Sequence, residues 1–122
     1  MLKKVTFVLA LVMLSLVGAR PALADMEMQC TEDMTTVASL QMCVQHAYDQ
    51  GFIYNKGVAT SLLTQLDNAQ AAVDAGQTGV AISILQTFIV QVESLAGVQI
   101  DPDHAQHMVH HAEMVIEALA AQ

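Results

Sequence analysis

The histidines are the residues of this chain that are best suited to chemistry, and four of the five stand close together near the C-terminus. They are His104, His107, His110 and His111, with Glu113 and Glu117 after them. In a helix, at about 100° per residue, His104, His107 and His111 would lie within about 60° of one another, beside the apolar stripe rather than inside it. Neutral imidazoles bind zinc, copper and nickel. The spacing makes these three residues candidate ligands of a transition-metal ion.

Two other interpretations of the same histidines stay open. They can be ordinary polar residues on a solvated helix face, or they can respond to pH, since protonation of all five below about pH 6 would add five positive charges. The spacing is not that of a metalloprotease, which needs a glutamate beside the first histidine. Gln106 and Met108 flank His107 instead.

The first 24 residues predict a secretory signal peptide. Lys3 and Lys4 precede an apolar run over residues 5–17, and Ala22-Leu23-Ala24 forms a small-residue cleavage site. A run of about a dozen apolar residues is shorter than the roughly 20 that a membrane span needs. We expect cleavage after Ala24 and export to the periplasm or the medium, with an uncleaved anchor as the alternative. No later segment is expected to span a bilayer.

Removal of this peptide leaves a strongly acidic chain. Three of the four cations leave with it and all twelve acidic residues stay, so 98 residues remain with a formal charge of −11 and Lys56 as their one Lys or Arg. This charge repels nucleic acid and anionic lipid, and we expect neither as a partner. It favours solubility; attraction to a basic partner or to cations is the other interpretation.

Cys30 and Cys43 are the two cysteines, and an exported chain favours a disulfide between them. In one continuous helix they would lie roughly 20 Å apart, whereas a disulfide needs Cα atoms within about 7 Å. The chain must therefore double back between them, and the first helix should begin at Thr35 or Thr36, either of which can cap it. A redox-active pair is disfavoured, because catalytic dithiols usually have Cys-x-x-Cys spacing.

Soft potential ligands gather around the first cysteine. They are Met26, Met28 and Cys30, with Met34 and Met42 nearby. Thioethers and thiolates select Cu(I). Methionine at helical spacing is more often adaptable core filling, however, and a disulfide would remove the best ligand of this group. A copper site here stays the lesser alternative.

Apolar residues recur at helical spacing in four segments, so we expect an all-α fold: a small up-down bundle of about four helices with one disulfide. Asn55 should cap the second helix and Gly76 should end it. The third helix should run to Gly97, and Asp101-Pro102 should begin the fourth. The residues expected to be buried are Leu62, Leu66, Phe88, Ile89 and Ile116. One face of the third helix should carry Val80, Ile84, Phe88, Val92 and Leu95, widened by Ala81, Leu85, Ile89 and Ala96.

Residues 51–119 resemble the FIMAH-type helical module of secreted bacterial proteins. The residues that carry the resemblance are Gly51, Ile53, Asn55, Leu62, Leu63, Leu66, Ala69, Ala72, Gly76, Ala81, Leu85, Phe88, Ile89, Val92 and Gly97. The resemblance implies a non-catalytic helical domain, which in the family often follows an extracellular hydrolase or stands in a multidomain surface protein. The disulfide-bearing segment before residue 51 and the histidines of the last helix depart from this pattern.

The expected organisation is a signal peptide (1–24), a disulfide-stapled segment with the first helix (25–50), and a three-helix segment (51–122) that packs with it as one domain. No nucleophile, base or phosphate loop stands at a diagnostic spacing, so we expect no enzyme. The first hypothesis is a secreted, non-catalytic binding or structural module that recognises a protein or another surface macromolecule. The alternative is a periplasmic or extracellular transition-metal binder that uses His104, His107 and His111 with Zn, Ni or Cu. No other cofactor is expected.

Overall fold

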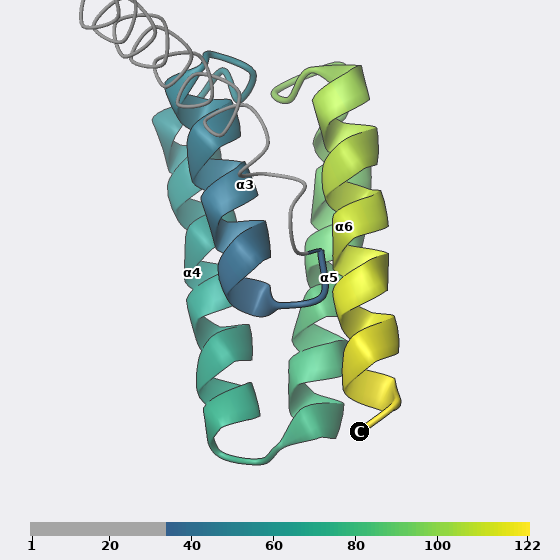
Figure 1. Ribbon diagram of the computed structural model, residues 1–122. Coiled ribbons are helices and arrows are strands. Elements are labelled where there is room, and N and C mark those ends of the chain that lie inside the picture. Colours follow the sequence, from purple (N-terminus) through teal and green to yellow (C-terminus); the bar gives the residue numbers. More distant parts are fainter. Residues whose placement is uncertain (1–33) are drawn as a thin grey trace, which may run out of the picture.

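The computed structural model describes residues 34–122. Four helices follow one another: α3 (Val37–Asp49), α4 (Lys56–Asp74), α5 (Thr78–Leu95) and α6 (Pro102–Ala120). Figure 1 shows an up-down bundle in which α3 lies beside α4 and α5 beside α6. Helix α3 also packs against α6, which closes the ring. The expected all-α bundle is confirmed. The predicted signal peptide, together with Met26, Met28 and Cys30, lies outside the described residues.

The helix starts follow from capping residues that the sequence identified. Thr36, Asn55 and Asp101 precede α3, α4 and α6, and the side chain of each accepts a hydrogen bond from a backbone N–H of the first turn. Pro102 takes the first helical position of α6, where its missing N–H costs nothing. These three predicted starts are confirmed.

Glycines with positive φ end the first three helices. Gly51, Gly76 and Gly97 have φ values of 86°, 73° and 77°, a region that costs residues with a Cβ about 1–2 kcal/mol. After Gly76 the chain reverses within two residues, which places α4 and α5 antiparallel. The predicted ends at Gly76 and Gly97 are confirmed.

Two loops at the same end of the bundle are joined to each other. Ile53, after α3, forms an antiparallel bridge with Ile100, before α6. The backbone N–H of Asp101 donates to the carbonyl of Phe52 at 2.8 Å. The ring of Phe52 is thereby fixed beside the first turn of α6, where the histidines begin.

The core is formed by one face of each helix. Leu62, Leu66 and Phe88 are fully buried, as expected. The expectation was wrong for Ile89 and Ile116, which are partly buried and pack at the edge of the core. Each follows an inward-facing residue, and one step of about 100° turns it toward the rim.

The buried face of α5 differs in part from the predicted one. Val80 is 51% exposed, whereas Ala81 and Leu85 are fully buried with Phe88 and Val92. Among the described helices, α5 alone is long and apolar enough to cross a membrane. The sequence had led us to expect no such segment after the signal peptide. Helix α5 packs against both α4 and α6, and a core helix of a folded bundle meets the same criteria of length and composition.

Candidate metal centre between helices α3 and α6

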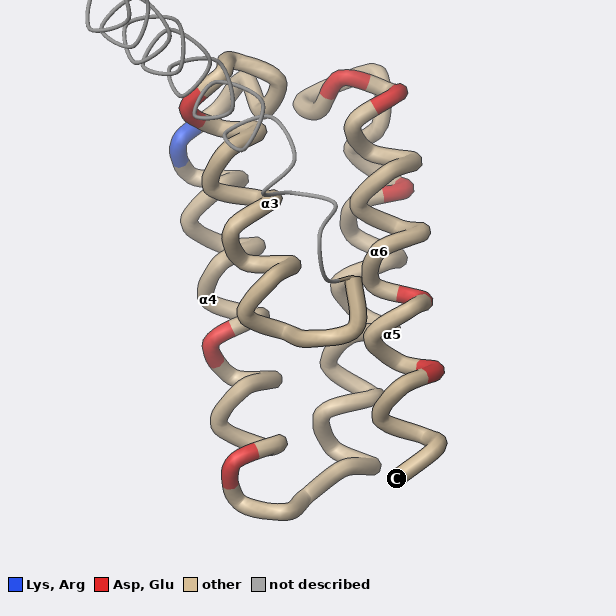
Figure 2. The backbone as a smooth tube through the Cα atoms, viewed as in Figure 1, with Lys and Arg blue, Asp and Glu red and all other residues tan. Residues whose placement is uncertain are grey.

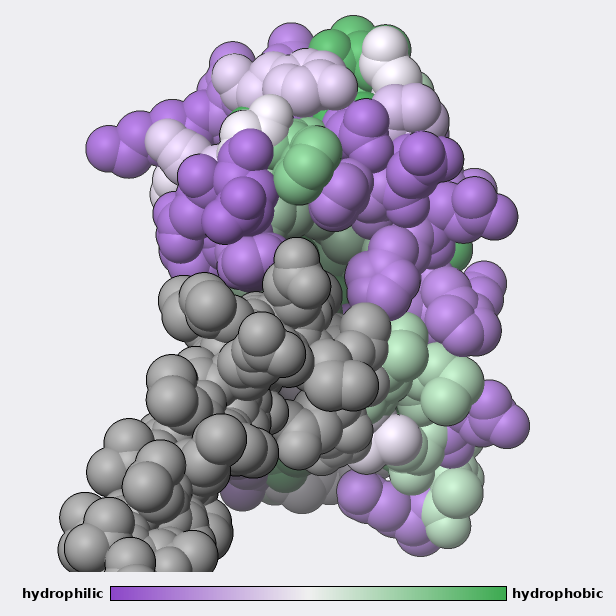
Figure 3. All heavy atoms as spheres, turned by 45° about the horizontal axis from the view of Figure 1, so that its top comes forward, coloured by the Kyte–Doolittle hydropathy of each residue, from purple (hydrophilic) through white to green (hydrophobic). Residues whose placement is uncertain are grey.

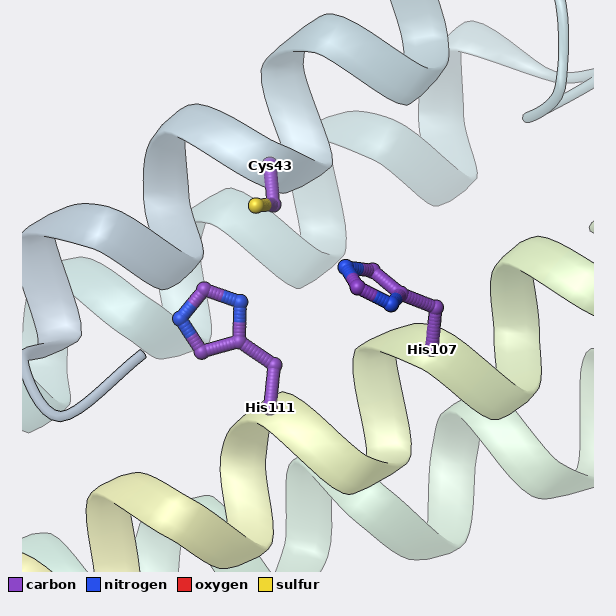
Figure 4. A group of neighbouring side chains, drawn as sticks. All are labelled: Cys43, His107 and His111. Carbon is purple, nitrogen blue, oxygen red and sulfur yellow. The ribbon is translucent and has the colours of Figure 1, made fainter. Parts of the chain in front are cut away.

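Three side chains with metal-binding atoms converge where α3 faces α6. Cys43 comes from the middle of α3, and His107 and His111 come from α6 (Figure 4). One potential ligand atom from each lies within 4.8 Å of the other two. His107 and His111 are separated by four residues, so they lie one helical turn apart on the same side of α6. This group of three is called the Cys43–His107–His111 cluster below.

A pocket of about 300 Å³ opens beside the cluster between α3 and α6. Its lining residues are Cys43, His46, Ala47, Asp103, His104, His107 and Met108. Imidazole, carboxylate and sulfur groups therefore surround a space large enough for an ion and its water ligands, since one water takes about 30 Å³ of liquid. The pocket combines residues that are about 60 positions apart in the sequence.

His111 lies inside the core rather than beside it. Its side chain has 0% exposure, so the predicted position at the edge of the apolar stripe is wrong for this residue. The cause is on α3, because the Ser39 hydroxyl lies 2.9 Å from His111 Nε2 and gives the buried ring a polar contact. A buried imidazole without such a contact would be costly.

His107 is partly buried and lies edge-on to His111, with ring centroids 6.3 Å apart and an interplanar angle of 74°. Its pKa is lowered, first because burial disfavours the charged ring and second because His104 and His110 would add like charge. A lowered pKa keeps the ring neutral to a more acidic pH, and the neutral ring is the form that binds metal.

His104, the third histidine of the predicted site, has other contacts. Its ring stacks on Phe52 with centroids 3.6 Å apart and planes 14° from parallel. Its Nδ1 lies 2.8 Å from Asp101 Oδ2, and this hydrogen bond is the main reason that the pKa of Asp101 is lowered. His104 lines the same pocket, yet the structure groups His107 and His111 with Cys43 instead.

The other predicted ligands are dispersed or outside the described residues. His110 is exposed on the outer side of α6. Met42 is 50% exposed, and the remaining soft group around Met26 and Cys30 lies outside the described residues. Cys43 and His46 were not predicted from the sequence as neighbours of the α6 histidines. The two residues are three positions apart, which places them on the same side of one helix, and this spacing was the sequence signal that could have identified them as a pair.

The state of Cys43 bears directly on the site. Its side chain is 2% exposed, and it is not a free thiol. Cys30, its predicted partner, lies outside the described residues, so the pairing itself stays a prediction. A sulfur engaged in a disulfide carries no thiolate charge and is a poor ligand.

Acidic residues are spread over the described helices. Figure 2 shows acidic positions along α4, α5 and α6, and Lys56 at the start of α4 as the one Lys or Arg in the described part of the chain. Figure 3 shows hydrophilic residues over much of the described surface at the end with the two joined loops, with small hydrophobic groups between them. Such a surface attracts cations.

Comparison with known proteins identifies the fold. The profile of the FIMAH domain matches residues 37–117. The chain belongs to the FIMAH domain family. The match begins at the first residue of α3, so the FIMAH domain includes all of α3 as well as α4, α5 and most of α6. The Cys43–His107–His111 cluster lies within it. No curated protein and no solved structure matches the chain.

Proposed function

We propose that this FIMAH domain is an exported, non-catalytic binding module and that its ligand is a transition-metal ion held between α3 and α6. The observation that carries the proposal is the convergence of ligand atoms from Cys43, His107 and His111 within 4.8 Å. His107 and His111 are the primary ligands, because neutral imidazoles suit Zn, Cu and Ni. The acidic surface raises the local concentration of cations.

The dimensions of the cluster support this assignment. Zinc binds imidazole nitrogen at about 2.0–2.1 Å and thiolate sulfur at about 2.3 Å, so the ligand atoms of a tetrahedral site lie about 3.3–3.8 Å apart. The ligand atoms of the cluster lie within 4.8 Å of one another. Small rotations of the three side chains would bring these atoms to the spacing of a zinc site. The pocket beside the cluster leaves room for water at the remaining positions.

We further propose that Cys43 is paired with Cys30, as expected for an exported chain. In that state the two histidines hold the ion, and water or another residue of the pocket completes its coordination. Reduction of the disulfide would release the Cys43 thiolate beside His107 and His111, which adds a third and stronger ligand. Metal affinity should therefore be higher with a thiol reductant than without one.

The close contact between the Ser39 hydroxyl and the His111 imidazole does not have the arrangement of a catalytic pair. Ser39 and His111 lie 2.9 Å apart, but the Ser39 hydroxyl donates its proton to the Thr36 carbonyl and both side chains are buried. A nucleophile must give its proton to the base and must reach the substrate. The contact therefore supports a structural role for Ser39 and His111.

The test is calorimetric titration of the purified protein with Zn, Ni and Cu ions, in the presence and absence of a thiol reductant. The unmutated protein should bind one ion with a dissociation constant below about 100 μM, which corresponds to about −5.5 kcal/mol. His107→Gln should weaken binding at least tenfold, because one of two imidazole ligands is lost.

His110→Gln is the matched control, since His110 is exposed on the same helix and is not among the residues that line the pocket. It should leave the affinity unchanged. Binding weaker than about 100 μM for every ion, or equal loss in the two variants, contradicts the proposed function.

A further inference from the structure

The Ser39 hydroxyl has two contacts that together constrain the proton on His111. Ser39 Oγ lies 2.8 Å from the backbone carbonyl oxygen of Thr36 and 2.9 Å from His111 Nε2. A serine hydroxyl has one proton to donate and lone pairs to accept with. The proton can therefore lie in one of these two contacts but not in both.

The hydroxyl proton of Ser39 lies in the contact with the Thr36 carbonyl oxygen. A carbonyl oxygen can only accept, so two oxygens 2.8 Å apart are stable only when a proton lies between them. Ser39 must then accept in its other contact, and His111 must donate from Nε2. A neutral imidazole with its proton on Nε2 carries its lone pair on Nδ1. Figure 4 shows one ring nitrogen of His111 turned toward His107 and Cys43 and the other turned away. Since Nε2 meets Ser39, the inward nitrogen is Nδ1.

We propose that Ser39 is the positioning residue of the metal site, holding His111 as the Nε2–H tautomer so that the Nδ1 lone pair faces the ion. The presence of the ion rests on the proposed function, whereas the tautomer of His111 does not depend on it. Ligating histidines usually donate their other N–H to a fixed acceptor, and loss of that acceptor commonly lowers metal affinity 10–100-fold.

Helix capping fixes Ser39 itself. The Ser39 backbone N–H donates to Thr36 Oγ1 at 3.1 Å while its hydroxyl donates to the Thr36 carbonyl. Both bonds run from Ser39 to Thr36, and the hydroxyl bond holds the Ser39 side chain in one rotamer at the first turn of α3. The N-terminus of α3 therefore sets the orientation of a ring on α6, 72 residues later in the chain.

The first experiment records long-range ¹H–¹⁵N spectra of the histidine rings in the metal-free protein. His111 should show a protonated, pyrrole-like Nε2 and an unprotonated, pyridine-like Nδ1. The opposite tautomer, or a rapid mixture of both, would overturn the proposal. This result does not depend on whether the protein binds metal, so it fails separately from the proposed function. It also decides the proposal if the variants below do not fold.

The second experiment compares Ser39→Ala, Ser39→Thr and the control Ser83→Ala, which alters an exposed serine on α5. Ser39→Ala should allow both neutral tautomers of His111 and weaken Zn binding about 10–100-fold. Ser39→Thr keeps a hydroxyl and should retain both properties, and Ser83→Ala should change neither. A Ser39→Ala protein with the parental tautomer and affinity contradicts the positioning role.

Discussion

At the residue scale, the contact between Ser39 and His111 connects stability with the proposed function. His111 is fully buried, and its Nε2 meets the Ser39 hydroxyl at 2.9 Å. A buried polar group that loses its partner costs about 1–3 kcal/mol, whereas replacement of both partners by apolar groups can be nearly neutral. The pair therefore need not be the most stable filling of this part of the core. The proposed metal site would give the ring a role besides stability.

A double-mutant cycle tests this balance. Ser39→Ala alone should lower the free energy of unfolding by about 1–3 kcal/mol, because the His111 N–H loses its acceptor. Adding His111→Leu should recover most of that loss and abolish metal binding. Urea denaturation of the two single variants and the double variant measures the coupling. Additive losses would show that the two residues do not depend on each other.

The lowered pKa of His107 gives a prediction for pH. Because its folded pKa lies below the ordinary 6.5, the unfolded chain takes up a proton first. The metal-free domain should lose stability as the pH falls through 6.5 toward the folded value. Zinc binding should persist to a more acidic pH than binding to a free imidazole. Ring ¹⁵N titration of the metal-free protein measures the pKa of His107. A midpoint at or above 6.5 would contradict the lowered pKa.

The sequence predicted part of this site. Spacing alone placed His107 and His111 on the same side of one helix. It could not place His111 inside the core, because the hydroxyl that forms a hydrogen bond with the buried ring belongs to Ser39 on α3. The same limit hid Cys43 and His46, since helical periodicity gives the angle of a residue on its own helix and not which helix packs against it.

At the element scale, the caps and the chain reversals were the most predictable features. Thr36, Asn55, Gly76 and Asp101-Pro102 each act through local backbone chemistry, so neighbouring residues suffice to identify them. The inward face of α5 was less predictable. Val80 lies on the side of α5 that also carries Ser83, Thr87 and Gln91, and it is half exposed, whereas Ala81, one step of about 100° further round the helix, is fully buried.

Two glycines provide a matched test of the α4–α5 reversal. Gly76 has φ +73° and Gly79 lies in the first turn of α5, and neither would bring an added Cβ within 4 Å of another atom. Gly76→Ala should destabilise the domain by about 1–2 kcal/mol. Gly79→Ala should stabilise it by up to about 1 kcal/mol, because alanine is the better helix former. Thermal unfolding distinguishes the two, and equal shifts would contradict the assigned conformations.

At the scale of the whole molecule, the FIMAH domain joins its first and last helices through the proposed ion. All four helices contribute to the apolar core, and α3 and α6 also bring the polar side chains of Ser39 and His111 into it. An ion that binds the folded chain and not the unfolded one stabilises it by about 2.7 kcal/mol at a free concentration 100 times the dissociation constant. The proposed ion would therefore couple metal binding to closure of the bundle.

X-ray absorption at the zinc edge of the zinc-loaded protein identifies the atoms bound to the ion. We expect a first shell with two imidazole nitrogens at about 2.0–2.1 Å, joined by sulfur at about 2.3 Å after reduction with a thiol. The imidazole signal should disappear in His107→Gln/His111→Gln and persist in His110→Gln. A shell of oxygen ligands alone, unchanged among these proteins, would contradict a metal centre between α3 and α6.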